Sequence, residues 1–154
     1  MSDSVIQGGY AGGTNVITTD PILGSPGDYG GFSQTIPLLP GSSAIDTGNA
    51  TYCTAGSDQR GEPYLDGCDI GAFESQGFTF SDLTGTPQSA QINSFFLTQL
   101  GLTVTANHPG DPVNGGTVTF TPPPSGASLS SIANNPATIS GGIATSGSVM
   151  LLGC

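Results

Sequence analysis

Hydrophobic and polar residues alternate along short stretches in the second half of the chain. In LTVTAN, residues 102–107, Leu102 and Val104 alternate with threonines, and GTVTFT, residues 116–121, repeats the pattern. Period-two alternation with threonine on one face is typical of half-buried antiparallel strands. Further candidate strands are GFTFSDL, AQINSFF, ATISGG and IATSGSV. Short strands at this spacing predict a β-sandwich, and no stretch has convincing helical periodicity.

The first half of the chain carries its apolar residues in short runs that glycine, proline and asparagine interrupt. SVIQGG and TNVITTDPILG predict two short strands, and the pair Val5–Ile6 recurs as Val16–Ile17 eleven residues later. Short strands separated by tight turns suit the coils of a β-solenoid. We expect the inward side chains here to include Phe32, Ile36, Leu38, Leu39 and Ile45. The composition shifts near residue 76, which predicts two domains, 1–76 and 77–154.

Composition and charge remove several classes of function. The 154 residues are 35% hydrophobic and only 8% charged, which predicts a folded, β-rich protein rather than a disordered one. The formal charge is -10 with one Arg and no Lys, which excludes a nucleic-acid-binding surface and disfavours anionic membranes. No apolar run approaches the roughly 20 residues that span a bilayer, so we expect no membrane insertion. The first residues lack the basic and apolar regions of a signal peptide, so we expect any export signal to lie upstream.

Residues 58–74, DQRGEPYLDGCDIGAFE, concentrate the charge of this weakly charged chain. They contain the only Arg or Lys, Arg60, and five carboxylates: Asp58, Glu62, Asp66, Asp69 and Glu74. One interpretation is a catalytic or Ca²⁺ site, with Asp58, Asp66 and Asp69 as acids, bases or ligands. Arg60 would then bind a substrate carboxylate. The other interpretation is structural, with Arg60 paired to Asp58 or Asp69. The spacing matches no EF-hand loop and no nonapeptide Ca²⁺ repeat.

Several ordered motifs resemble a known family. DPILGSPGDYGGFSQTIPLLPGSSAIDTGN, then Cys53, DQRG and CDIGAFE, are similar to the C-terminal end of bacterial surface proteins with right-handed parallel β-helices. These proteins are of the choice-of-anchor Q or polymorphic outer-membrane-protein type, and the likeness covers about residues 3–75. Residues 77–150 resemble a bacterial Ig-like module. The resemblance implies an all-β chain: terminal coils and cap of a β-helix over 1–76, followed by an incomplete Ig-like sandwich over 77–154.

The resemblance also bears on the charged stretch and on the cysteines. It places residues 58–74 at the terminal coil, which favours a cap ion pair of Arg60 with Asp58 and Asp69 over a catalytic or metal site. Cys53 and Cys68, fifteen positions apart, are either free thiols or a disulfide. Likeness to extracellular proteins favours the disulfide.

Two further features are expected to carry no chemistry. His108, the only histidine, falls in the turn-rich NHPGDP and is expected to be an exposed turn residue without a catalytic partner. Cys154 ends SGSVMLLGC, an apolar tail that we expect to be unrelated to the Ig-like pattern.

The resemblance implies a non-catalytic structural or adhesion segment of a large secreted or cell-surface bacterial protein. Its partners would be upstream β-helix coils and downstream Ig-like repeats, together with extracellular carbohydrate or protein. The alternative is the non-catalytic C-terminal end of a β-helix polysaccharide lyase or hydrolase, with weak carbohydrate binding through Tyr10, Tyr29 or Tyr64. Both predict no cofactor.

Overall fold

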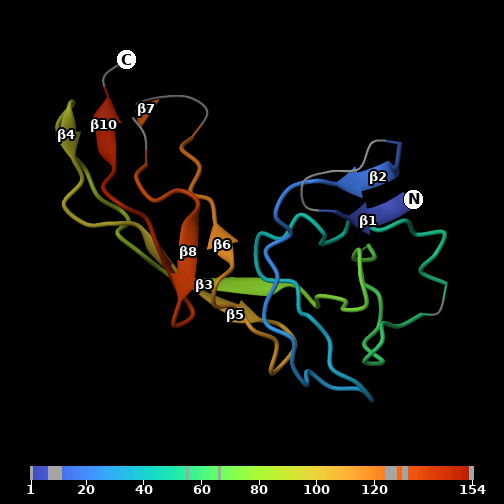
Figure 1. The fold of residues 1–154 in the computed structure, drawn as a ribbon. Coiled ribbons are helices and arrows are strands. Elements are labelled where there is room, and N and C mark those ends of the chain that lie inside the picture. The colour runs from blue at the N-terminus through green and yellow to red at the C-terminus, as the bar shows by residue number, and fades with distance from the viewer. Residues whose placement is uncertain are drawn as a thin grey trace. The chain divides into compact units, whose positions relative to one another are not determined.

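The computed structural model describes residues 2–6, 12–54, 56–65, 67–123, 128–129 and 132–152. Within these ranges the fold is all-β and contains no helix, so none is long and apolar enough to cross a membrane (Figure 1). The chain divides into two compact units. The first unit is Met1–Phe78 with Ala106–Pro112, and the second is Thr79–Thr105 with Val113–Cys154.

A pair of parallel strands opens the first unit. β1 (Ser2–Val5) and β2 (Thr14–Ile17) lie side by side, with Ser4 opposite Val16 and Val5 opposite Ile17 (Figure 1). The two predicted strands are therefore confirmed, and the register offsets them by twelve residues rather than eleven. Parallel pairing of named strands in the described residues is confined to these two, so a right-handed parallel β-helix is not shown. Antiparallel bridges, such as that between Leu23 and Leu38, connect the turns that follow.

The core of the first unit contains some of the side chains that were expected to point inward. Its buried hydrophobic residues are Leu38, Leu39, Ala44, Cys68 and Phe73. The expectation for Phe32 was wrong, because its side chain is fully exposed at 108%. Gly30 and Gly31 immediately before it have positive φ angles of 103° and 81°, so the backbone bends here instead of continuing as a strand. Ile36 is also largely exposed, at 46%.

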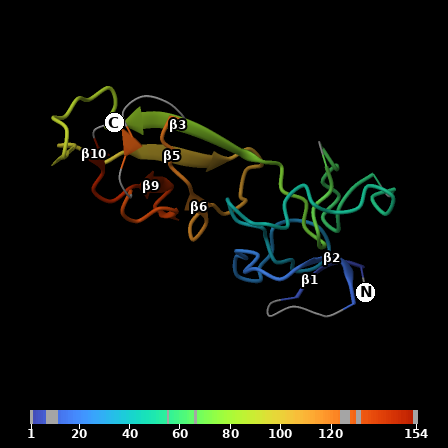
Figure 2. The same cartoon turned by 90° about the horizontal axis from the view of Figure 1, so that it is seen from above.

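The second unit holds two sheets. Five strands lie in the order β3–β5–β9–β8–β6, and three in the order β4–β10–β7. The strands of the first sheet are β3 (Phe78–Thr84), β5 (Gly101–Ala106), β6 (Thr117–Val118), β8 (Ala137–Ser140) and β9 (Ile143–Thr145). Figure 2 shows β3 beside β5. β5 pairs antiparallel with β9, with Leu102 opposite Ala144. The predicted alternation is confirmed on β5 and β6, where Val104 and Val118 are buried while Thr105 is exposed.

Residues 150–152 of the apolar tail form a strand that pairs within the fold. β10 (Met150–Leu152) is the central strand of the smaller sheet, between β4 (Ser94–Phe95) and β7 (Ser128–Leu129). Leu151 lies opposite Ser94 on one side and Leu129 on the other, antiparallel to both. Val149, immediately before β10, is buried at 2% exposure. Met150–Leu152 is a segment of only three apolar residues without alternation. It forms a strand because β4 and β7, on either side, supply its backbone partners.

Candidate functional site

Asp58 organises the first turn of the charged stretch. One of its carboxylate oxygens, Oδ1, accepts the backbone N–H groups of Arg60 at 2.7 Å and Glu62 at 3.0 Å. The backbone closes the same turn, because the N–H of Asp58 donates to the carbonyl of Glu62 at 2.8 Å. Gly61 sits in this turn at φ 92°, a left-handed conformation that favours glycine. Asp58 and Gly61 therefore fix the backbone conformation at Arg60.

The Arg60 side chain is buried and every nitrogen of its guanidinium has a partner. Nε donates to Asp58 Oδ2 at 2.9 Å, Nη1 to Asp111 Oδ1 at 2.9 Å, and Nη2 to the carbonyl oxygen of Glu74 at 2.6 Å. The guanidinium also lies over the ring of Phe73, 3.6 Å from the ring centroid. The three acceptors and the aromatic ring complement a flat, delocalised cation. The Arg60 side chain is 1% exposed, so its ion pairs offset the cost of removing the guanidinium from water.

The second oxygen of Asp58 joins this turn to the end of the charged stretch. Oδ2 accepts the N–H of Glu74 at 2.9 Å as well as Nε of Arg60. Burial pushes the pKa of Asp58 upward, but the hydrogen bonds from Glu74 and Arg60 outweigh it, so the pKa lies below its ordinary value of 3.8. Asp58 is therefore held as a carboxylate whose two oxygens accept four N–H groups.

Asp69 and Glu74 are buried carboxyls that hold neighbouring backbone segments. Asp69 accepts the N–H of Asp46 at 2.8 Å and that of Ser75 at 2.6 Å, while its own N–H donates to Glu74 Oε2 at 2.9 Å. Burial raises the pKa of Asp69, although those two hydrogen bonds oppose the change. Burial also raises the pKa of Glu74, to about 6, and the negative charge of Asp69 adds to the rise.

His108 and Asp111 come from the turn between β5 and β6 and belong to the first unit. Asp111 Oδ1 lies 2.9 Å from Arg60 Nη1 and 3.2 Å from His108 Nδ1. His108 Nε2 in turn lies 3.2 Å from Glu62 Oε1. The His108 side chain is 27% exposed, so the expectation of a freely exposed turn residue missed its two carboxylate neighbours. We call Asp58, Arg60, Asp69, Glu74 and Asp111 the Arg60 network.

A disulfide joins Cys53 to Cys68, with the two Cα atoms 6.3 Å apart. The disulfide links the turn of residues 49–53 to Cys68, which immediately precedes Asp69. The N–H of Gly48 donates to the carbonyl of Cys68 at 2.7 Å. A Cβ at position 48 would lie 2.6 Å from that carbonyl oxygen, so the close approach requires glycine. The disulfide and this contact hold the start of the Asp69 segment in place.

The remaining residues of the sequence-based interpretations fall into two groups. Tyr10, Asp66 and Cys154 lie outside the described residues. The Tyr29 ring meets the Phe73 ring edge to face, with centroids 6.1 Å apart, and its hydroxyl donates to the carbonyl of Ser25 at 3.0 Å. Tyr64 is half-buried. Tyr29 therefore has a packing contact with Phe73 and is itself half-buried.

The structure brings Arg60 and Asp58 together and places Asp69 elsewhere in the network. The second carboxylate on the guanidinium is Asp111, which sequence reasoning missed. A turn aspartate distant in sequence carries no periodic or motif signal that would identify it. Among the described residues, no three His, Cys, Asp or Glu side chains are grouped to hold a metal ion.

The carboxylates of the network hydrogen-bond to the backbone of the first unit. Its carboxylates accept backbone N–H groups from four separate segments, near residues 46, 60, 69 and 75. The Asp58 and Asp111 side chains are only 2% and 7% exposed. No family model, curated protein or solved structure matches this chain.

Proposed function

We propose that the chain is a non-catalytic structural segment of a secreted or cell-surface bacterial protein. In this proposal, residues 1–76 are the last coils and cap of a right-handed parallel β-helix, and residues 77–154 are an Ig-like sandwich. The observation that carries the proposal is the use of the buried carboxylates. Asp58, Asp69 and Glu74 each accept backbone N–H groups of the chain itself. The buried Arg60 side chain pairs with Asp58 and Asp111 and packs on the Phe73 ring.

The geometry of Asp58 and Arg60 argues against a catalytic role for them. A general acid or base must come within hydrogen-bond distance of the substrate atom it serves. Both oxygens of Asp58 already accept two N–H groups each, and the side chain is 2% exposed. The Arg60 side chain is 1% exposed, and each nitrogen of its guanidinium already donates to an acceptor of the chain itself. A cap that must keep irregular backbone satisfied needs this arrangement, since buried N–H groups without partners are unfavourable.

Three further observations support the proposal. β1 and β2 pair in parallel at a twelve-residue offset, as stacked coils of a solenoid do. The two antiparallel sheets of the second unit suit an Ig-like sandwich. The Cys53–Cys68 disulfide suits an oxidising compartment outside the cytosol. The alternative parent, a β-helix polysaccharide lyase or hydrolase, would carry its catalytic groove upstream and leave this segment the same structural role.

The test combines a stability measurement with an activity measurement on the whole chain. Asp58→Asn converts an acceptor-only side chain into one with a donor amide facing N–H groups, so we expect a lower urea midpoint. Asp82→Asn, at an exposed site on β3, is the matched control and should leave the midpoint unchanged. Wild type is also incubated with polygalacturonate, alginate and chondroitin, and unsaturated products and new reducing ends are followed.

We expect no turnover of any of the three polysaccharides. Turnover that disappears in Asp58→Asn or Asp69→Asn, in a chain that remains folded, would overturn the proposal and make the Arg60 network an active site. An unchanged urea midpoint for Asp58→Asn would also count against it, because a cap residue with four N–H partners must affect stability.

A further inference from the structure

The turn of residues 49–53 in the first unit contains the sequence Asn49-Ala50-Thr51, which has the form of an attachment motif for N-linked sugars. The motif is an Asn followed two positions later by Ser or Thr, with any residue except Pro between them. The chain has seven asparagines, and Asn49 is the only one with Ser or Thr two positions later. So short a motif also arises by chance, and the structure around Asn49 therefore decides whether it is a site.

Asn49 begins a turn that its side chain and its backbone both close. Its Oδ1 accepts the N–H of Thr51 at 3.0 Å, and its carbonyl oxygen accepts the N–H of Tyr52 at 2.8 Å. Asn is favoured at the first position of such turns because its short side chain reaches the N–H two residues ahead. The turn therefore uses the oxygen of the Asn49 amide, whereas an N-linked sugar is attached to the nitrogen.

The fold leaves the two groups that the motif contributes to glycosylation unengaged. Among the described residues, neither Nδ2 of Asn49 nor the hydroxyl of Thr51 has a hydrogen-bond partner. Asn49, Ala50 and Thr51 are all exposed. A transferase can therefore reach both groups without breaking a contact of the folded chain, and the bond between Oδ1 and the Thr51 N–H survives the modification.

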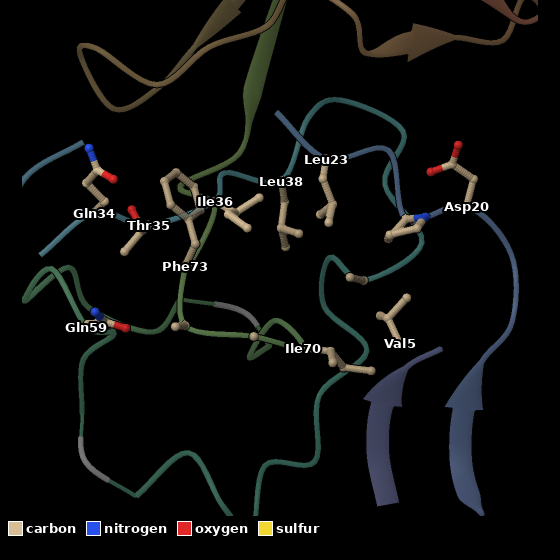
Figure 3. Close-up of a pocket in the computed structure, with 14 residues that line it drawn as sticks. Val5, Asp20, Leu23, Gln34, Thr35, Ile36, Leu38, Gln59, Ile70 and Phe73 are labelled. Carbon is tan, nitrogen blue, oxygen red and sulfur yellow. The ribbon is translucent and has the colours of Figure 1, made fainter. Parts of the chain in front are cut away.

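The turn lies apart from the cavity of the first unit. That cavity has a volume of about 740 Å³, and its walls include Leu38, Ile70 and Phe73 (Figure 3). No residue of 49–53 lines it. A sugar on Asn49 would therefore extend into solvent and would not compete with side chains for space in the cavity.

Two neighbouring features suit a glycosylated surface. Tyr52, in the same turn, is 71% exposed, and the C–H face of a sugar can cover part of an aromatic ring favourably. Cys53, the next residue, forms the disulfide with Cys68. Disulfides persist outside the cytosol, and N-linked sugars are carried by surface loops of secreted proteins. The turn therefore combines an accessible attachment motif with a sign of the compartment in which such motifs are used.

From these observations we infer that Asn49 is a site of N-linked glycosylation. Its Nδ2 attacks the anomeric carbon of a sugar that is activated by a diphosphate. The bond between Nδ2 and that carbon forms, and the bond from the carbon to the diphosphate oxygen breaks, with the electron pair leaving on the diphosphate. Nδ2 loses one proton to a basic group of the transferase, and nothing is oxidised or reduced. The inference goes beyond the proposed structural function and does not depend on it, because the turn and the Arg60 network share no residue.

The test uses the whole, folded chain with its disulfide intact. One sample receives UDP-glucose and a soluble N-glycosyltransferase, and a second receives a lipid-diphosphate-linked oligosaccharide and a membrane oligosaccharyltransferase. Mass spectrometry of the intact chain and of its fragments locates any added sugar. We expect one glycan per chain, on Asn49, in at least one sample. The sample that reacts shows whether the activated sugar comes from a nucleotide or from a lipid carrier.

Matched variants separate the motif from the turn. Asn49→Asp keeps an oxygen for the Thr51 N–H and removes the nitrogen, so the turn should remain and the glycan should be lost. Thr51→Val keeps the backbone N–H and removes only the hydroxyl, and it should lose the glycan too. Thr51→Ser retains the hydroxyl and should be modified. Asn114→Asp, at an exposed site outside the motif, is the control and should be modified as wild type is. Thermal unfolding checks that each variant is folded.

Wild type without a glycan in both samples would overturn the inference. Modification only after the disulfide is reduced and the chain is unfolded would overturn it as well, because the turn would then be no attachment site in the folded protein. A glycan that persists in Asn49→Asp would lie on another residue and would have the same consequence.

Discussion

Arg60 and Asp111 form an ion pair in which Nη1 donates to Oδ1 at 2.9 Å, although 51 positions separate the two residues. Asp111 lies in the segment 106–112, which belongs to the first unit, whereas β6 and all of β5 except Ala106 belong to the second. Arg60 holds Asp58 at the same time, so one cation neutralises two buried carboxylates. The stability of the first unit is therefore expected to depend strongly on this side chain.

Arg60→Met keeps the apolar stem beside Phe73 and removes the charge. Asp58 and Asp111 are then left buried without their cation, which is expected to lower the free energy of unfolding by about 3–5 kcal/mol. Urea unfolding measures the loss. Glu62→Gln is the control, because the contact of Glu62 Oε1 with His108 Nε2 is about 30% exposed and should contribute less than about 1 kcal/mol. Equal effects of the two substitutions would show that the Arg60 charge is not a structural requirement.

Much of the strand content was predictable, because alternation and turn residues are local signals. The strands of LTVTAN and GFTFSDL, and the parallel partners β1 and β2, follow from such patterns. The partner of Arg60 was not predictable, since Asp111 lies in a distant turn and no period links the two. Phe32 was wrongly predicted to point inward because the prediction rested on its hydrophobicity. It did not take account of the two preceding glycines, whose positive φ angles turn the chain. The β10 strand was missed because its pairing depends on distant neighbours rather than on its own three residues.

Glu74 should make the protein more stable in mild acid than at neutral pH. Its pKa is raised from 4.5 to about 6 in the folded chain, chiefly by burial, so the folded state binds a proton more tightly than the unfolded state. The free energy of unfolding should therefore rise as the pH falls from above 6 toward 4.5, by about 2 kcal/mol at 1.36 kcal/mol per unit. Urea unfolding across this pH range measures the slope.

Glu74→Gln separates this effect from the rest of the titration. The variant should lose most of the slope and keep the part that the raised pKa of Asp69 contributes. Asp58 acts in the opposite direction, because its lowered pKa gives stability that is lost only as the pH falls below about 3.8. A flat profile between pH 6 and 4.5 in wild type, or an undiminished slope in Glu74→Gln, would contradict the assignment.

Replacing Cys53 and Cys68 together by serine should lower the free energy of unfolding by about 3 kcal/mol, as expected for a closed loop of this length. The loss arises mainly from the freedom that the unfolded chain regains. Thermal unfolding with and without reductant measures the same quantity in wild type. The double variant is its own control, because reductant should no longer change its midpoint. A wild-type midpoint that ignores reductant would mean that the disulfide does not contribute.

Ending the chain after Val149 should loosen the β4–β10–β7 sheet. β10 is its central strand, and the N–H of Asn93 donates to the carbonyl of Leu151 at 2.7 Å. Without Leu151 the Asn93 amide should exchange with deuterium at least about tenfold faster, the effect of ~1.4 kcal/mol of lost protection. The Val104 amide, bonded to Gly142 at 2.7 Å in the larger sheet, is the internal control and should retain most of its protection. Unchanged exchange at Asn93 would refute a structural role for Met150–Leu152, whereas loss at both amides would make the two sheets one cooperative unit.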